Sequence, residues 1–226
     1  MQYEEIDAAF AGSGLICRGG FHPEAADGVP QPNGPAATVV VVGNAGPEMW
    51  QRFSAAYSAD HRQAEANPLN DWTRDLIGKA AAALGAAAVY PFDGPPYLPF
   101  QRWAMRADGV HVSPIGPLIH PQYGLWHAYR GALLLTERID VPAEFSEPSP
   151  CDGCADKPCL GTCPVDAFSV EGYDVPACRD YIATVAGEDC LGAGCLARRA
   201  CPVGRDYIYA PDQARFHMQR FLTSTM

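Results

Sequence analysis

Eight of the nine cysteines in this 226-residue chain lie between positions 151 and 201, and this clustering constrains the fold more than any other feature. The first four are spaced as CxxCxxxxCxxxCP, and the last four are separated by longer, unequal gaps. A proline follows the cysteine at 163 and again the cysteine at 201. Such a density of thiols indicates disulfides, a zinc site or the ligands of an iron–sulfur cofactor.

Disulfides and zinc fit the sequence less well than an iron–sulfur cofactor. The N-terminus, MQYEEIDAAFAGSG, has no basic start and no apolar segment, so it does not read as a secretory signal. A cytoplasmic location is therefore expected, and the cytosol keeps thiols reduced. Zinc sites favour two CxxC pairs, or one CxxC with an HxxxH pair, whereas this region has one CxxC and no histidine between 128 and 216. Four-iron clusters fit best, because they take three closely spaced cysteines and a remote cysteine that precedes proline.

The two Cys-Pro junctions predict two 4Fe–4S clusters that share the two cysteine runs. In two-cluster ferredoxins, the fourth cysteine of one run binds the cluster of the other run. By that logic, the ligands of the first cluster are Cys151, Cys154, Cys159 and Cys201. The ligands of the second cluster are Cys163, Cys178, Cys190 and Cys195. The gaps are longer than the usual bacterial spacing, so the exact assignment of cysteines to clusters stays open at this stage.

The chain that precedes these cysteines alternates strand and helix signals. The run ATVVVV at 37–42 is typical of a strand that is buried on both faces. Residues 68–84 predict a helix. A further helix is expected after Asp93, with Pro95 and Pro96 in its first turn. Together these signals predict an α+β fold with a sheet layer rather than a helical bundle.

A break in composition divides the chain into two predicted domains. The stretch ERIDVPAEFSEPSP at 137–150 has three prolines and no clear periodicity. We expect residues 1–145 to bind a cofactor or a partner, and residues 146–226 to hold the two clusters and a C-terminal helix. The net charge of −10 and the absence of a basic face predict no nucleic-acid partner. The longest uncharged run, at 80–92, is too short to span a membrane, so no membrane partner is expected.

Two stretches outside the cysteine motif resemble known families. HPQYGLWHAYRG at 120–131 is similar to the HPxxGxWxAxRG segment of the CblC-type cobalamin reductase and dealkylase. The order of FDGPPYLPFQRWAMRADG, SPIGPLIHPQYGLW and ACRDYI resembles epoxyqueuosine reductase over residues 86–205. The resemblance implies a flavin-reductase-like, CblC-like domain followed by a small ferredoxin-like domain with two clusters. It also implies that cobalamin lies beside the clusters.

The resemblance also implies roles for five residues of this chain. Asp93 matches the proton donor of epoxyqueuosine reductase, although an aspartate before a helix is also a natural N-cap. Arg130 matches an arginine that lines the pocket above the corrin, and the alternative is an ion pair. His120 is a candidate cobalt ligand or pocket wall, and Tyr123 and Trp126 are candidates for the corrin face. For these three the alternative is structural packing.

Two functions remain in competition. The first is an iron–sulfur oxidoreductase whose clusters pass electrons to a corrinoid, or alternatively to a flavin such as FMN, in the N-terminal domain. The second is a ferredoxin-type electron carrier or redox adaptor whose N-terminal domain only docks a partner protein. In either case the expected partner is an electron donor such as flavodoxin, ferredoxin or a reductase. A tRNA substrate is not expected, because the chain is acidic and shows none of the helical repeats with which epoxyqueuosine reductase binds tRNA.

Overall fold

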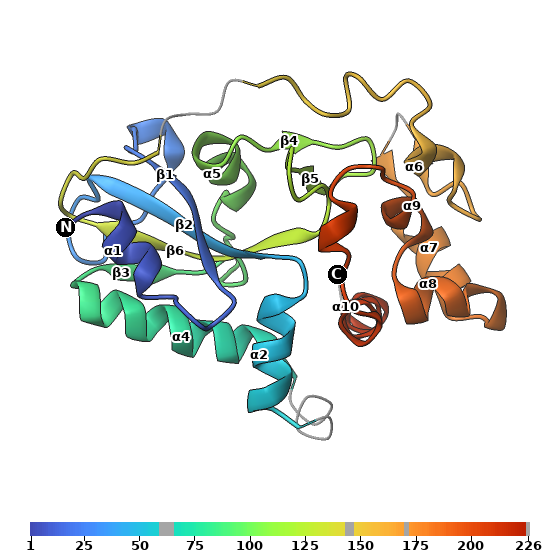
Figure 1. The fold of residues 1–226 in the computed structure, drawn as a ribbon, viewed down its shortest axis with the longest axis horizontal. Helices are drawn as coiled ribbons and strands as arrows, with labels where there is room; N and C mark the ends of the chain where they lie inside the picture. Colours follow the sequence, from blue (N-terminus) through green and yellow to red (C-terminus); the bar gives the residue numbers. More distant parts are fainter. Residues whose placement is uncertain (59–65, 143–146, 170–171, 225–226) are drawn as a thin grey trace. The chain divides into compact units, whose positions relative to one another are not determined.

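A computed structural model describes residues 1–58, 66–142, 147–169 and 172–224. Helices and antiparallel strands occur together in it, which confirms the predicted α+β class (Figure 1). Within these residues, no helix combines the length and the hydropathy needed to cross a membrane.

The chain forms two compact units whose boundaries differ in one respect from the predicted domains. The first unit combines Met1–Gly109 with His127–Glu147. The second combines Val110–Trp126 with Pro148–Met226. The prediction that residues 1–145 form one unit is therefore corrected, because residues 110–126 pack with the cysteine region. Part of the expected joint, residues 143–146, lies outside the described residues.

The sheet of the first unit is built around its most apolar strand. Its strands are hydrogen-bonded in the order β1-β2-β6-β3, and each neighbouring pair is antiparallel. The side chains from Val39 to Val42 in β2 are fully buried, as the β-branched run predicted. The bounds are β1 Ile16–Phe21, β2 Thr38–Ala45, β3 Ala87–Val89 and β6 His127–Leu135.

Helices cover both faces of this sheet (Figure 1). On one face, Trp103 of α5 packs in a cluster with Val39 and Val41. On the other face, α4 packs against β3 and β6, with Ile77 close to Gly131. The predicted helix at 68–84 is confirmed as α4. The bounds are α1 Tyr3–Ala8, η1 Ala25–Asp27, α2 Glu48–Ala56, α4 Pro68–Leu84 and α5 Phe100–Ala107.

Helix α5 begins later than the sequence predicted. The expectation that Pro95 and Pro96 lie in its first turn is wrong, since the helix begins at Phe100 and its N-cap is Pro99. A residue that precedes proline is disfavoured in the helical region, so the series of prolines delays the helix until the last of them has passed. Asp93 consequently lies in a loop ahead of the helix and does not cap it.

The second unit consists of short helices and two-stranded hairpins. Residues 110–126 belong to it because Ile115, Ile119 and Leu125 are buried in one apolar cluster with cysteines of the motif. The predicted C-terminal helix is present as α10, which packs against α8. The bounds are β4 His111–Val112, β5 Leu118–Ile119, α6 Pro158–Gly161, β7 Phe168–Ser169, β8 Gly172–Tyr173, α7 Val175–Ile182, η2 Val185–Gly187, α8 Glu188–Ala193, α9 Leu196–Arg199, η3 Arg205–Tyr207 and α10 Pro211–Thr223.

Candidate iron–sulfur sites

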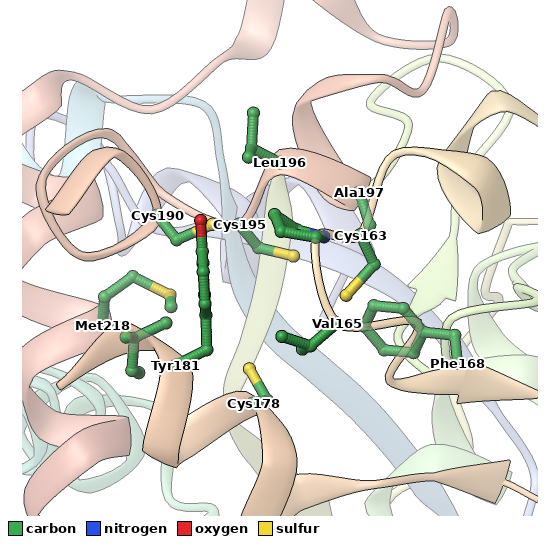
Figure 2. Close-up of a pocket in the computed structure, with 12 residues that line it drawn as sticks. Cys163, Val165, Phe168, Cys178, Tyr181, Cys190, Cys195, Leu196, Ala197 and Met218 are labelled. Atoms are coloured by element: carbon green, nitrogen blue, oxygen red, sulfur yellow. The ribbon is translucent and has the colours of Figure 1, made fainter. Parts of the chain in front are cut away.

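Four cysteines line one pocket in the second unit (Figure 2). They come from separate elements: Cys178 lies on α7, Cys190 on α8, Cys195 just before α9 and Cys163 after α6. Figure 2 shows the sulfur atoms of Cys163, Cys178 and Cys195 directed into the same space. We call this cavity the second cysteine site.

The walls of the second cysteine site are largely apolar. Apolar side chains keep water away from whatever the thiols hold and lower the local dielectric constant. The apolar wall residues of the second cysteine site are Pro164, Val165, Phe168, Ile182, Leu196, Ala197 and Met218. Tyr181 also lines the cavity, and its hydroxyl donates a hydrogen bond to the Ala186 carbonyl at 2.8 Å.

The other four cysteines of the motif line a separate pocket in the same unit. We call it the first cysteine site, and its thiols are those of Cys151, Cys154, Cys159 and Cys201. Residues 110–126 supply part of its wall through Pro114 and Ile119. The remaining wall residues are Pro150, Lys157, Pro158, Pro202 and Val203.

The eight cysteines therefore divide four and four, with one cysteine exchanged between the two runs. Cys163 of the first run lies with the second set, and Cys201 of the second run lies with the first set. Within the described ranges, the structure groups no three histidine, cysteine or carboxylate side chains closely enough to hold one metal ion. Four thiols at each pocket match the number of ligands that a four-iron cluster takes. A zinc ion would instead draw its thiolates to about 2.3 Å from a single point.

Burial raises the pKa of thiols in both cysteine sites. Desolvation is the largest cause for each of them, and neighbouring cysteines add to it in both sites. Because the thiolate is the form that binds metal, metal binding at either site would release protons. The thiols concerned are those of Cys151, Cys159 and Cys201 in the first site and Cys178, Cys190 and Cys195 in the second.

The segment HPQYGLW meets the loop that follows Cys201. A Cβ atom at Gly124 would overlap the carbonyl group of Val203, and a Cβ at Gly204 would overlap the backbone of Tyr123. Both glycines have positive φ angles, +57° and +72°, which glycine adopts without strain. The two backbones can approach this closely because neither position has a side chain.

An arginine fastens the same segment to α9. The Nε of Arg198 donates to the Leu125 carbonyl at 3.0 Å, and a second guanidinium nitrogen donates to the same oxygen. The guanidinium carbon lies 4.6 Å from the ring centroids of both Trp126 and Tyr209. Helix α9 lies between Cys195 of the second site and Cys201 of the first site. The contacts of Arg198, which we call the Arg198 clamp, therefore connect residues 110–126 to the segment that joins the two sites.

The structure places three of the residues singled out by the resemblance in the second unit. The Nδ1 of His120 accepts the backbone N–H groups of Gln122 and Tyr123 at 3.0 and 3.2 Å, and its ring stacks on Tyr123. Trp126 is 1% exposed and packs in a cluster with Tyr209. These contacts give all three residues a structural role in this unit. Their predicted roles toward a corrinoid stay predictions.

The other two predicted residues lie in the first unit. The carboxylate of Asp93 pairs with Arg74 at 2.5 Å, and both side chains are about half exposed. The Nε of Arg130, on β6, donates to the Oδ1 of Asn44 at 3.3 Å. The predicted role of Asp93 as a proton donor is not tested by this geometry.

A buried ion pair in the first unit was missed by the sequence reasoning. Arg18 and Asp108 are 2% and 6% exposed, and their charged groups lie 2.5 Å apart. The hydroxyl of Tyr129 donates to the same carboxylate at 2.5 Å, and Arg18 also donates to the Asn44 carbonyl at 3.3 Å. Burial raises the pKa of Asp108, and Arg18 opposes that rise. The available signal was a lone arginine inside the apolar stretch GLICRGG.

Comparison with solved structures identifies the fold. An epoxyqueuosine reductase solved with a tRNA-Tyr epoxyqueuosine-modified stem loop is 14% identical, with a TM-score of 0.54 and coverage of 93% of this chain and 69% of that chain. A selenomethionine-labelled epoxyqueuosine reductase is 13% identical, with a TM-score of 0.50 and coverage of 80% and 52%. The C. elegans B12-trafficking protein CblC, a human MMACHC homologue, is 14% identical, with a TM-score of 0.47 and coverage of 97% and 95%. No protein-family model and no curated protein matches the sequence.

Two of these structural neighbours are epoxyqueuosine reductases, one of the two kinds of protein whose motifs the sequence resembles. The fold assignment rests on the two reductases, whose identity to this chain is low enough that the likeness concerns the fold alone. This chain spans about half the length of one of these reductases and about two thirds of the other. Activity, substrate and partners must therefore be argued from the site itself.

Proposed function

We propose that this chain is an iron–sulfur oxidoreductase that binds two 4Fe–4S clusters, one in each cysteine site, and passes electrons to a corrinoid. The observation that carries the proposal is the four-and-four division of the cysteines around two separate cavities. The sequence logic of two-cluster ferredoxins predicts the same division, including the exchange of Cys163 and Cys201. Both the pockets and the sequence logic support these ligand sets.

The protein's own contribution is to hold, shield and space the clusters. When bound, each cluster would supply one-electron transfer. The thiolates hold the irons, and the apolar walls exclude water that would otherwise stabilise charge at the site. The wall residues Pro114 and Ile119 make the first site dependent on residues 110–126. The clamp of Arg198 on Leu125 keeps that wall in position.

The corrinoid part of the proposal rests on residues of the HPQYGLWHAYRG segment. Arg130 is held by Asn44 through its Nε, which orients the guanidinium for polar groups of a ligand. His120, Tyr123 and Trp126 are the further candidates for contact with a corrin, or with FMN in the flavin alternative. Asp93 is the proposed proton donor, and it must leave Arg74 to act in that way.

A second candidate function, an electron carrier or redox adaptor, is favoured by the environment of Asp93. Its side chain is about half exposed and pairs with Arg74, so its carboxylate is not enclosed in an apolar pocket. In this alternative the first unit docks a partner protein and holds no corrinoid. Both functions require an electron donor, for which flavodoxin, ferredoxin or a reductase is proposed. No nucleic-acid partner is proposed.

Iron and sulfide analysis of anaerobically purified protein tests the cluster proposal. We expect about eight irons per chain, and about four after Cys154→Ser or Cys190→Ser, because each replacement removes one ligand from one set. Cys17→Ser is the matched control, since Cys17 lies on β1 of the first unit, outside both cysteine sites. Zinc in place of iron, or an equal loss of iron from the Cys17→Ser variant, would contradict the proposal.

Titration of the cluster-loaded protein with hydroxocobalamin separates the two candidate functions. A saturable shift of the visible spectrum in the range of tens of micromolar supports the oxidoreductase. Arg130→Ala should weaken that binding, whereas Arg52→Ala, which removes an exposed partner of Glu48, should leave it unchanged. If no spectral shift occurs with cobalamin and FMN does not bind, the result supports the electron carrier or redox adaptor.

A further inference from the structure

The walls of the two cysteine sites differ by one charged residue. Lys157 lines the first site, and among the described residues that line either site it is the only lysine, arginine, histidine, aspartate or glutamate. It lies between two cysteines of that site, three positions after Cys154 and two before Cys159. The wall of the second site is made of apolar side chains and Tyr181. The first site therefore has a positive charge in its wall, and the second site does not.

The backbone at Lys157 is also unusual. Its φ and ψ angles of +37° and +59° lie in the left-handed region, and the next residue, Pro158, begins α6. The carbonyl of Lys157 accepts the N–H of Leu160 at 2.9 Å. This region favours glycine or asparagine over residues with long side chains. Residues in such conformations are held there by their surroundings and are often found at functional sites. Backbone preference therefore does not account for a lysine at this position.

Two acidic residues of the same loop lie outside the wall of the first site. Asp152 and Asp156 are exposed, and neither is among the described residues that line the site. Water screens their charges more than it screens a charge at the wall. Lys157 is itself partly in contact with solvent, since its residue is exposed as a whole. Its effect on the site should consequently have the size of a surface interaction rather than that of a buried one.

We infer that Lys157 makes the cluster of the first cysteine site the one with the higher reduction potential. This inference rests on the two clusters proposed above. Reduction adds one electron to a cluster and neither forms nor breaks a bond, so the negative charge of the cluster and its thiolates grows. A positive charge in the wall of the first site stabilises that added charge, and the uncharged wall of the second site does not. An electron that enters at the second site is therefore transferred to the first.

The test is a redox titration of the cluster-loaded protein, read by electron paramagnetic resonance. Dithionite supplies the electrons and is oxidised to sulfite. Cys190→Ser and Cys154→Ser, which should each keep one cluster, assign the signals, and in the wild type the first-site signal should appear first. Lys157→Asn removes the charge and tolerates a positive φ. At a fixed potential we expect the ratio of reduced to oxidised first-site cluster to fall roughly threefold, which is about 28 mV at about 59 mV per tenfold change.

Two control variants separate the charge of Lys157 from its structural role. Lys157→Arg keeps the positive charge, so the first-site potential should stay as in the wild type. Lys79→Gln removes the other lysine of the chain, which pairs with Asp75 on α4 of the first unit, and should leave both potentials unchanged. If Lys157→Asn does not assemble its clusters, Lys157→Gly is titrated in its place, because glycine removes the same charge and adopts a positive φ without strain.

The outcomes separate this inference from the proposed function. Iron and sulfide content is measured first, and a chain without two reducible clusters overturns both. With two clusters present, a second-site signal that appears first in the wild type overturns the role of Lys157 alone. An unchanged or higher first-site potential in Lys157→Asn, an equal shift of both clusters, or the same shift in Lys157→Arg also overturns that role and leaves the clusters in place.

Discussion

Replacing Gly124 by alanine should damage the first cysteine site without touching any cysteine. The new Cβ would overlap the Val203 carbonyl oxygen and lie 2.6 Å from its carbon, whereas ordinary contacts begin at 3.4 Å. The two backbones must therefore separate by more than about 0.8 Å, because the carbonyl oxygen of Val203 lies closer to the new Cβ than the carbon does. Overpacking of this kind costs about 1–3 kcal/mol, and alanine at φ +57° adds about 1–2 kcal/mol. The free energy of unfolding should fall by about 2–5 kcal/mol.

The separation of the two backbones displaces the loop after Cys201, so iron should be lost selectively from the first site. We expect Gly124→Ala to lose iron from the first site, toward about four irons per chain, while the cluster of the second site keeps its signal. Gly28→Ala is the control, because Gly28 has a similar φ of +63° but no atom lies within 4 Å of its added Cβ. Urea unfolding and iron analysis measure both effects. If Gly124→Ala matches Gly28→Ala in stability and in iron content, the close approach of Gly124 to Val203 is not required for the site.

Three further predictions follow from other contacts. Arg198→Met removes the bonds to the Leu125 carbonyl and the contacts with two aromatic rings, so the free energy of unfolding should fall by about 2–4 kcal/mol. Arg215→Met, at an exposed pair, should change it by less than about 1 kcal/mol in the same urea titration. Burial raises the pKa of Asp108, so folding favours its protonated form, and its contribution to stability falls as pH rises above its unfolded pKa of about 3.9. Between pH 4 and 7, the free energy of unfolding of the wild type should fall relative to that of Asp108→Asn as pH rises. The opposite slope would mean that the attraction of Arg18 outweighs the effect of burial. If Asp93 donates a proton, Asp93→Asn should abolish turnover with a competent substrate while Arg74→Met retains it, and equal effects would point to the ion pair alone.

Some parts of the fold were predictable because a local property decides them. The run at 38–42 is β-branched throughout, and such a run is stable chiefly when both faces are buried, as they are in β2. Helix α4 begins at Pro68 and ends at Leu84, before Gly85, and both limits follow from the positions that proline and glycine favour at helix ends. The beginning of α5 was misjudged because each proline also restricts the residue before it.

Other parts depended on contacts between distant segments, which local patterns do not encode. Nothing in SPIGPLIHPQYGLW indicates that it packs with the cysteine region, since its apolar residues would suit either unit. The pairing of Arg18 with Asp108 joins a strand to the residue after α5, 90 positions away in sequence. The sequence predicted a four-and-four division of the cysteines, because the chemistry of a four-iron cluster fixes the number of ligands and the Cys-Pro junctions indicate which cysteine is remote. The two pockets group the cysteines in the same way, and their binding of clusters stays a prediction.

Iron content in paired cysteine replacements tests the central claim most directly. The claim is that Cys163 belongs with the second set although it lies in the first run. Replacing Cys163 and Cys178 together by serine should remove one cluster and leave about four irons per chain, whereas replacing Cys163 and Cys151 together should remove both clusters. The reverse result, with four irons left in the second pair and none in the first, would show that each run holds its own cluster and would contradict the account.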